Sequence, residues 1–559
     1  MELTGAQITV KSLEDEGVKT VFGLPGGTVI PLYDALYDAS LQHVLVRHEQ
    51  AAAHAADGFS RVGDEVGVCI ATSGPGATNL VTGLATAHRD SSPMVAITGQ
   101  VSTASIGTDS FQEAHMMGIS LSIVKHSMQA RRPEDIPRMM QDAFFIASTG
   151  RPGPVVLDLP LDVQKAVGEY RRPSRPGVSY PGYSAELPED LSRLDEGVKL
   201  IRDAERPVLL AGNGVNLSRA FDSLRNFSEE LEIPAATSLL GKGAIRDDHP
   251  NFIGMMGMHG SAAANQAIMT ADLIIAVGTR FSDRSTGRSS EFAQTARVLH
   301  IDIDNSEIRK NIKADVYLIG DADRVLRLLT REAAGHNSAS RRNWREKIRQ
   351  IAAESAQPDV SDDLIHPRQI LEALDDVTQG NVIVTTEVGQ HQMWAAQYHK
   401  ALSPRSFVTS GGLGTMGFGI PASIGAHFGR PGLPVACIAG DGSAMMNIQE
   451  LDTCARYNLP VKVLLFDNNC LGMVRQWQQL FYSNRYSQTL YARQPDFVKI
   501  AQGMGVEAFS VSSPEKIRIA LKRAFEIPGP VLVHFPIPQT ENVFPMVPAG
   551  ESLANMLLN

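Results

Sequence analysis

The stretch IAGDGSAMMNIQELDTCARYNLPVKVLLFDNNCLGM, residues 438–473, decides the fold because it holds two apolar runs that each end in polar residues. Residues 434–440 are apolar and run into Gly-Asp-Gly, which predicts a buried strand and a tight turn. Residues 461–466 predict a second buried strand. Apolar residues between them recur at the spacing of one helix: Met445, Ile448, Leu451 and Ala455. The stretch therefore predicts a βαβ unit with two parallel strands.

The polar residues that end these strands predict a site for a cation and a phosphate. Asp441 and Asn468 are expected to lie together, because the carboxyl ends of parallel strands meet at one edge of a sheet. Carboxylate and amide oxygens suit Mg²⁺. Gly442 and Ser443 are small and open a helix, where free N–H groups favour a phosphate. The alternative is that these polar residues only form turns.

A rival nucleotide-binding pattern lies just upstream. Gly412, Gly414 and Gly417 follow GxGxxG order between a predicted strand and a predicted helix. Asp441 follows about two dozen residues later, near where such a motif places the acid that binds a ribose. Asp441 is flanked by glycines, however, and belongs to the turn described above. Binding of NAD is therefore the less favoured interpretation of this pattern.

Composition indicates a soluble globular protein. The chain has 559 residues, of which 43% are hydrophobic and 20% charged, enough for three or four domains. A net charge of −10 argues against nucleic acid or an anionic membrane as partner. No apolar run approaches the roughly 18 residues of a membrane-spanning helix, and no signal pattern opens the chain. Four cysteines without a CxxC pair favour a reducing compartment, so we expect a cytoplasmic protein.

Polar segments divide the chain into domains. A segment rich in Pro, Arg, Ser and Tyr follows residue 168, and a second polar segment ends at residue 363. The patterns around them predict an α/β protein of three domains, each a mainly parallel sheet flanked by helices. The expected units are an N-terminal domain (1–168), a linker (169–190), a central domain (191–335), a linker (336–363), a C-terminal domain (364–540) and a tail (541–559).

Glu49 is a further candidate, in the sequence HVLVRHEQAAAHAADGFSRV of residues 43–62. It follows a predicted strand and opens an Ala-rich helix, where the helix dipole favours a carboxylate. On this pattern alone Glu49 is better interpreted as a residue that starts a helix than as a catalyst.

Taken together, these stretches resemble thiamin-diphosphate enzymes, and most closely the catalytic subunits of the acetohydroxyacid synthase (acetolactate synthase) family. The matching segments run from about residue 5 to 545 and include FGLPGGTVIPLYDAL, RHEQAAAHAADGFSR, TSGPGATNLVTGLATA, IGTDSFQE, MGMHG, GGLGTMGFG and LGMVRQWQQLFY. The resemblance implies the thiamin-diphosphate-binding fold. Its three domains would bind the pyrimidine of the cofactor, FAD, and the diphosphate with Mg²⁺, in chain order.

The resemblance also implies roles for the residues at matching positions. Mg²⁺ would be held by Asp441, Asn468 and the backbone carbonyl of Cys470. Thiamin diphosphate would contact Glu49, Gly389, Gln390, His391, Gly414, Met416, Gly442 and Ser443. The implied catalytic residues are Glu49, which would hydrogen-bond the pyrimidine ring, with Gly27, Phe111 and Gln112. FAD would contact Arg151, Gly212, Gly214, Thr237, His259, Arg280, Asp283, Asp302 and Asp321. The second substrate would meet Arg284, Met473 and Trp477.

The reaction that the resemblance implies joins two 2-ketoacids. Pyruvate would be decarboxylated on thiamin diphosphate, and its two-carbon unit ligated to pyruvate or 2-ketobutyrate. The product, 2-acetolactate or 2-aceto-2-hydroxybutyrate, belongs to the biosynthesis of valine, leucine and isoleucine. The active site would lie between two protomers, so the minimum unit is a homodimer, with a dimer of dimers and a small regulatory subunit as further expectations.

The chain departs from the family pattern at three places. The motif RFDDR is here RFSDR, residues 280–284, with Ser282 in place of an acid, which leaves the affinity for flavin open. Leu161 stands where the family has a lysine, and residues 102–104 read Ser-Thr-Ala. These positions line the substrate channel in the family, so inhibitor sensitivity is left open.

Two other functions stay open. One is a different FAD and thiamin-diphosphate enzyme such as a pyruvate oxidase, and the other is a scaffold that binds cofactors without catalysis. The ring of Trp477 and the charge of Arg284 suit a second ketoacid, which favours the carboligase over the oxidase. Glu49 together with the Asp441–Asn468 pair argues against the scaffold. The sequence leaves acceptor preference and feedback regulation open.

Overall fold

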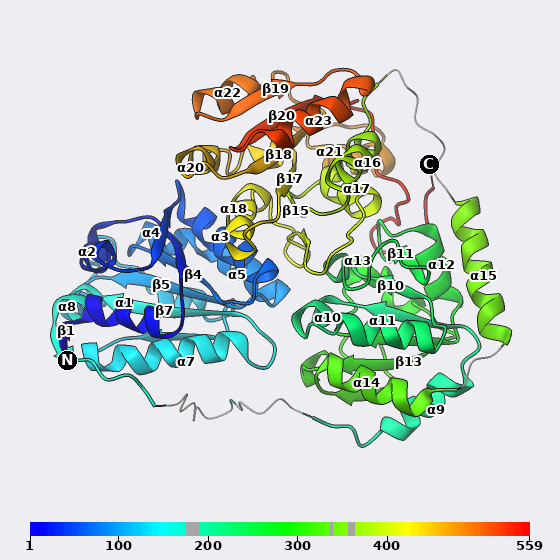
Figure 1. The fold of residues 1–559 in the computed structure, drawn as a ribbon, viewed down its shortest axis with the longest axis horizontal. Helices are drawn as coiled ribbons and strands as arrows, with labels where there is room; N and C mark the ends of the chain where they lie inside the picture. The colour runs from blue at the N-terminus through cyan, green and yellow to red at the C-terminus, as the bar shows by residue number, and fades with distance from the viewer. Residues whose placement is uncertain (175–182, 184–188, 336–338, 356–363, 559) are drawn as a thin grey trace.

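Three parallel sheets, one per domain, make up the fold. The computed structural model describes residues 1–174, 183, 189–335, 339–355 and 364–558. Over these ranges the chain forms three six-stranded sheets, each flanked by helices (Figure 1). Every strand pair within the three sheets is parallel. The predicted α/β class, with three mainly parallel sheets, is therefore confirmed.

The N-terminal domain lies at the lower left of Figure 1 and has the strand order β3-β2-β4-β5-β7-β6. Its strands are β2 (Thr20–Gly23), β3 (Gln42–Leu45), β4 (Gly67–Ala71), β5 (Met94–Gln100), β6 (His126–Gln129) and β7 (Pro154–Pro160), with the antiparallel pair β1 (Glu2–Thr4) and β8 (Val167–Glu169) beside them. Its α-helices are α1 (Gly5–Asp15), α2 (Ile30–Tyr37), α3 (Glu49–Val62), α4 (Pro75–Asn79), α5 (Val81–Asp90), α6 (Met116–Ser120), α7 (Ile136–Ser148) and α8 (Leu161–Lys165). Strands β4, β5 and β7 are buried over their whole length, as in a sheet covered on both faces.

The central domain lies at the right of Figure 1 and has the strand order β11-β10-β9-β12-β13-β14. Its strands are β9 (Pro207–Ala211), β10 (Ala235–Thr237), β11 (Phe252–Met255), β12 (Leu273–Val277), β13 (Arg297–Asp302) and β14 (Val316–Ile319). Its α-helices are α9 (Leu194–Asp203), α10 (Asn213–Leu217), α11 (Phe221–Glu230), α12 (Ala262–Thr270), α13 (Asp283–Thr286) and α14 (Ala322–Ala333).

The C-terminal domain lies at the top of Figure 1 and has the strand order β16-β15-β17-β18-β20-β19. Its strands are β15 (Ile383–Thr386), β16 (Phe407–Val408), β17 (Val435–Gly440), β18 (Val461–Asp467), β19 (Glu507–Ser510) and β20 (Val531–Pro536). Its α-helices are α16 (Pro367–Thr378), α17 (Gln390–Tyr398), α18 (Gly419–Gly429), α19 (Asp441–Ala444), α20 (Glu450–Arg456), α21 (Gly472–Phe481), α22 (Phe497–Gly503) and α23 (Ile517–Glu526).

The helix predicted between the strands of residues 438–473 is two helices, α19 and α20. Met445, predicted to face the core, is 46% exposed, because the residues between the two helices form turns. The amide of Asn447 donates to the carbonyl of Gly417 at 2.7 Å and holds these turns to a neighbouring loop. The predicted parallel pairing of the strands is correct, since β17 and β18 are neighbours.

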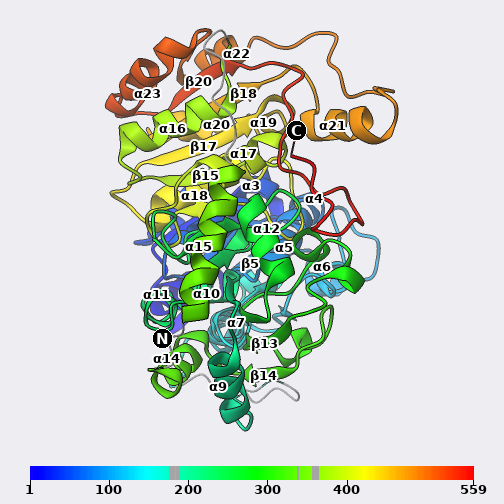
Figure 2. The same cartoon turned by 90° about the vertical axis from the view of Figure 1, so that its right-hand side faces the viewer.

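Two segments predicted to lie outside the domains pack on the central one. Helix α15 (Ala339–Glu354) falls within the predicted 336–363 linker, and it buries Trp344 and Ile348 against the central core beside α12 (Figure 2). In the predicted tail, Val547 and Leu553 join the same core. Their apolar side chains explain the packing. Most of the predicted 169–190 linker lies outside the described residues, and the domain boundaries stay predictions.

A buried arginine fixes α15 to the central domain. The guanidinium of Arg341, 1% exposed, donates to the carbonyl of Leu231 at 3.0 Å, of Ala204 at 3.2 Å, and of Ile201. These carbonyls belong to the C-terminal ends of α9 and α11, where the helix backbone has no partners of its own.

We expect Arg341→Met to lower the unfolding free energy of the central domain by about 3 kcal/mol, because buried carbonyls lose their donors. Hydrogen exchange of the amides in α9, α11 and α15 under mild urea measures this. The matched control is Arg349→Met on the same helix, whose exposed side chain pairs only weakly with Glu346 at 3.5 Å. Equal exchange rates in the two variants would contradict the role given to Arg341.

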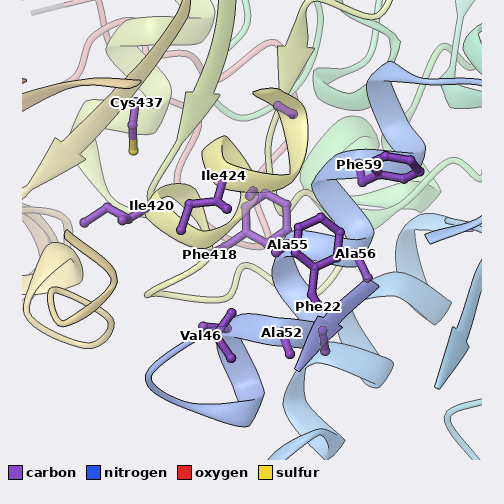
Figure 3. Close-up of a cluster of buried hydrophobic side chains, with 14 of the residues drawn as sticks. Phe22, Val46, Ala52, Ala55, Ala56, Phe59, Phe418, Ile420, Ile424 and Cys437 are labelled. Carbon is purple, nitrogen blue, oxygen red and sulfur yellow. The ribbon is translucent and has the colours of Figure 1, made fainter. Parts of the chain in front are cut away.

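The N-terminal and C-terminal domains share one hydrophobic core between α3 and α18. Figure 3 shows Ala55 of α3 next to Phe418, which directly precedes α18, with Ile420 and Ile424 of α18 in the same cluster. Phe59 packs edge-on against Phe22, with 6.1 Å between the ring centroids. The helices approach so closely that a side chain at Gly425 would place its Cβ 1.8 Å from the carbonyl oxygen of Ala55. Small residues on α3 therefore set the distance between the two domains.

No helix in the described part of the chain combines the length and the apolar character that crossing a membrane requires.

Candidate active site

Asp441 and Asn468 meet at one edge of the C-terminal sheet. Asp441 begins α19 directly after β17, and Asn468 follows the last residue of β18. Because the two strands are parallel neighbours, both residues line the same small cavity of about 70 Å³. Cys470, the third predicted metal ligand, also lines it. The structure thus brings together all three residues of the predicted Mg²⁺ set.

The oxygens of this set fit a hard cation. The carboxylate of Asp441 accepts the N–H of Gly442 at 2.9 Å and a hydrogen bond from the amide of Gln494. Burial, followed by the nearby charge of Asp467, raises the pKa of Asp441 well above its usual range, and a bound cation would compensate this costly charge. Asn468 uses its Nδ2 to donate to Gln390 at 3.0 Å. Its Oδ1 has no hydrogen-bond partner among the described residues and can ligate a cation. Carboxylate and amide oxygens are ligands that Mg²⁺ accepts.

The predicted diphosphate contacts line the same small cavity. These are Gly389, Gln390, His391, Gly442 and Ser443, joined by Met416. The ring of His391 is buried, burial lowers its pKa to about 3, and its Nε2 has no hydrogen-bond partner within the described ranges. A buried polar atom without a partner indicates a bound group that would supply one. The residues present therefore fit a polar ligand beside the cation site.

A larger cavity of about 700 Å³ adjoins the small one. The two share Val388, Gly389 and Met473 as lining residues. Gly414, the remaining predicted contact of thiamin diphosphate in this domain, lines the larger cavity. The two cavities are therefore contiguous.

The larger cavity gathers most of the residues predicted to contact FAD. Those that line it are Arg151, Gly214, His259, Arg280, Asp302 and Asp321. Three others do not line it: Gly212 packs against the backbone of Gly278, Thr237 is buried behind the wall, and the side chain of Asp283 is 82% exposed. The exposed position of Asp283 gives no support to a flavin contact, because helix α13 points that side chain outward.

Four arginines and four carboxylates line this larger cavity. Arg89, Arg151 and Arg280 all line it, and Arg151 is held by Asp304 at 3.0 Å and Glu307 at 2.7 Å. Burial, together with the neighbouring arginines, lowers the pKa of Arg280 despite the opposing effect of Asp90. At the end of β13, burial raises the pKa of Asp302 to about 6. A cavity of this size with clustered guanidinium groups fits a dinucleotide phosphate.

The predicted substrate residues lie where the two cavities meet. Met473 lines both, and Trp477 and Arg284 line the larger one. The guanidinium carbon of Arg284 lies 5.9 Å from the centre of the Trp477 ring. A cation and an aromatic ring brought together from two domains can bind an anionic group with a short apolar chain.

The predicted catalytic glutamate lies apart from these cavities. Glu49 begins α3, is buried, and accepts a hydrogen bond from Asn79 at 2.9 Å. Of the described residues that line the two cavities, none is Glu49, Gly27, Phe111 or Gln112. Phe111 is 87% exposed. Within one chain, therefore, the predicted acid–base residue does not lie at the predicted metal site.

Several site residues carry no pattern in the sequence. Gln494 joins Asp441 to Asp467, whose Oδ1 accepts at 3.2 Å, from a loop without recognisable spacing. Glu387 is fully buried behind the small cavity and accepts from Ser443 at 2.7 Å and from the N–H of Gly417 at 2.7 Å. Glu387 lies two residues before the predicted contacts 389–391, which is the one signal that pointed to it.

The chain matches three family models, all of thiamine pyrophosphate enzymes. An N-terminal TPP binding domain matches residues 3–119, a central domain 194–329, and a C-terminal TPP binding domain 387–535. The chain is 48% identical over 565 residues to a probable acetolactate synthase large subunit of Methanocaldococcus jannaschii, covering 99% of this chain and 95% of that protein. It is 46% identical over 556 residues to the acetolactate synthase isozyme 2 large subunit of Escherichia coli, covering 99% of both. An acetolactate synthase large subunit of Corynebacterium glutamicum is 44% identical over 560 residues, covering 98% of this chain and 89% of that protein.

Proposed function

This chain belongs to the acetolactate synthase family of thiamin-diphosphate enzymes, and on that premise we propose that its two contiguous cavities form the cofactor and substrate sites of that reaction. It decarboxylates pyruvate and ligates the two-carbon unit to a second 2-ketoacid, pyruvate or 2-ketobutyrate. The observation that carries the proposal is the small cavity, which gathers the predicted metal set and all the thiamin diphosphate contacts predicted in this domain except Gly414.

Each group of site residues has its own proposed chemical role. Bound thiamin diphosphate supplies the electron sink for loss of CO₂ and transfer of the two-carbon unit. Asp441, Asn468 and the carbonyl of Cys470 would hold Mg²⁺, and His391 and Ser443 would hold the diphosphate. Glu49 would share a proton with the pyrimidine ring, as a general acid–base group acting through that ring. Its burial favours such a role, because a buried carboxyl exchanges protons with what it touches rather than with water.

A homodimer is part of the proposal because one chain does not complete the site. Glu49 lies outside both cavities, so a second copy must bring it to the metal site. Large apolar side chains are exposed in the N-terminal domain, among them Tyr37, Phe111 and Leu121, and in the C-terminal domain Met446 and Tyr482. Exposed apolar surface of this extent typically marks an interface. Since the relatives named above are large subunits, a small regulatory subunit is a further proposed partner.

FAD is the proposed occupant of the larger cavity. Its volume and the four arginines among its lining residues support a dinucleotide. The net carboligation transfers no electrons, so the flavin would be structural. The four free, buried cysteines suit a reducing compartment and support a cytoplasmic location.

The decisive experiment incubates the purified chain with pyruvate, thiamin diphosphate, Mg²⁺ and FAD. We expect acetolactate as the main product and a flavin that stays oxidised through turnover. Acetaldehyde with peroxide, and flavin reduction in step with pyruvate consumption, would assign the chain to the oxidases. Binding of the cofactors without any product would identify the scaffold.

Trp477 is expected to set the choice of acceptor. Its ring lines the larger cavity beside Arg284, where an extra methylene of 2-ketobutyrate would find an apolar surface. Trp477→Leu should lower the preference for 2-ketobutyrate over pyruvate roughly tenfold, because one methylene in an apolar contact is worth about 1–3 kcal/mol.

Competition of both acceptors in one reaction, with both products quantified, measures this preference. The control is Tyr317→Leu, an aromatic residue of β14 whose ring centre lies 5.2 Å from the guanidinium carbon of Arg309 and which lines neither cavity. An unchanged product ratio in Trp477→Leu, with a lowered melting temperature, would show that Trp477 is a packing residue.

A further inference from the structure

One turn of the C-terminal domain belongs to the walls of both cavities. Gly411, Gly412 and Gly414 line the larger cavity, and Met416 lines the smaller one. Gly414 has a φ of +69°, a conformation that glycine adopts without strain. The position of this turn, residues 411–416, therefore affects what either cavity can bind.

A carboxylate from the N-terminal domain holds this turn. Asp90, the last residue of α5, accepts the N–H of Gly412 at 2.7 Å on Oδ1 and the N–H of Gly411 at 3.1 Å on Oδ2. Asp90 is buried, so these charge-assisted bonds do not compete with bulk water. It also lines the larger cavity, but both of its carboxylate oxygens already accept hydrogen bonds from the turn and from Arg61. Two successive backbone donors on one carboxylate fix both the position and the orientation of the turn.

Asp90 is itself held by a buried ion network. Arg61 donates to Asp90 Oδ2 at 2.9 Å, to both carboxylate oxygens of Asp57 at 2.7 and 2.9 Å, and to the carbonyl of Thr409 at 2.7 Å. The hydroxyl of Thr86 pairs with that of Thr415 at 2.7 Å. Removal of Arg61 would leave two buried carboxylates without compensation, whereas neutralising Asp90 leaves Arg61 paired with Asp57.

The central domain contacts the same region from the other side of the turn. The amide of Asn213 donates to the backbone carbonyl of Asp90 at 2.8 Å. A Cβ at Gly411 would lie 2.6 Å from Leu240, and one at Gly412 would lie 3.0 Å from the guanidinium of Arg280. The turn is thus enclosed by the N-terminal domain and by the wall of the larger cavity.

We propose that Asp90 is a positioning residue that, through the N–H groups of Gly411 and Gly412, makes binding in either cavity strengthen binding in the other. This inference rests on the proposed function, in which the smaller cavity takes thiamin diphosphate and the larger one FAD. A ligand that orders the shared turn lowers the entropy that the second ligand must remove on binding, so each ligand increases the affinity for the other.

The test compares cofactor affinities in the full-length chain and in Asp90→Asn. The amide keeps the shape but offers only one accepting oxygen, so one glycine N–H loses its partner. Thiamin diphosphate is titrated into the apoprotein with saturating Mg²⁺, with and without FAD, by calorimetry. We expect FAD to increase the affinity for thiamin diphosphate about tenfold in the wild-type chain, which is within the range usual for coupled sites. In the variant the increase should be less than about twofold.

The matched control is Asp272→Asn. Asp272 also accepts two successive backbone N–H groups, of Glu205 at 2.8 Å and of Arg206 at 2.9 Å, but lines neither cavity. The Asp272→Asn variant should be less stable, but FAD should still increase its affinity for thiamin diphosphate about tenfold. If Asp90→Asn does not fold, Thr86→Val removes the second link to the turn and should lower the factor partially.

An unchanged FAD effect in Asp90→Asn, or an equal loss in Asp272→Asn, would overturn the inference. Absence of any FAD effect in the wild-type chain, with both cofactors bound, would also overturn it while leaving the proposed function intact. A wild-type chain that binds neither cofactor would instead contradict the proposed function.

Discussion

Replacing Glu49 by glutamine is expected to lower turnover by about 10²–10⁴-fold without loss of the fold or of bound cofactor. Glutamine is isosteric and its Oε1 still accepts the hydrogen bond that Asn79 makes at 2.9 Å, so α3 should begin as before. The amide cannot take up or release a proton, so the proposed acid–base role is lost. Turnover is measured at saturating cofactor, and the affinity for thiamin diphosphate separately.

The control for this prediction is Glu65→Gln, a partly exposed carboxylate of the same domain. It should retain full activity. Near-wild-type turnover of Glu49→Gln would rule out the proposed acid–base role. A large fall in turnover accompanied by loss of the cofactor would indicate that Glu49 acts in binding.

Replacing Asp441 by alanine is expected to weaken binding of thiamin diphosphate by roughly 100-fold or more, because the diphosphate loses its cation. Asp441 is the one buried carboxylate in the predicted metal set, so no neighbour in that set supplies its charge. Retention of the cofactor after dialysis against a chelator measures the effect. Asp452→Ala, which removes a carboxylate from the adjacent helix α20, is the control and should retain the cofactor.

Mixing the two inactive variants distinguishes a site within one chain from a site between chains. In a mixed dimer, one of the two sites would receive Glu49 from one chain and Asp441 from the other. Random reassociation should therefore restore about a quarter of the wild-type activity. No recovery from variants shown to exchange subunits would contradict the dimeric site.

The sequence predicted the fold class and family because both rest on local or repeated patterns. Buried strands such as β17 and β18 are continuous apolar runs, and their parallel pairing follows from the single crossover between them. The predicted family is confirmed by relatives that match nearly the whole chain. The error came where tertiary contacts override local spacing, because turns break the helix expected at Met445. Helix α15, within the predicted linker, packs on the central core through contacts that no local spacing indicates.

Residues that act across domains had no such pattern. Asp90 and Gly412 are 322 positions apart, and Arg61 reaches Thr409 over 348 positions, so no window of sequence contains either pair. Conversely, Asp283 matched a motif although its side chain turns to solvent. Sequence motifs indicate the residues that would contact ligands. The contacts that hold those residues in place depend on how the three domains pack together.

The packing of the chain's last segment has a consequence for how this protein is made. Val547 and Leu553 complete a core whose other members include Phe281, Phe292 and Trp344. While the ribosome is still adding residues, the central domain has been synthesised but this apolar face stays uncovered. Such an exposed apolar face promotes aggregation until residues 547–553 have left the ribosome. Translation that stops short of residue 547 should therefore yield nascent chains that depend on chaperones and that protease clears quickly.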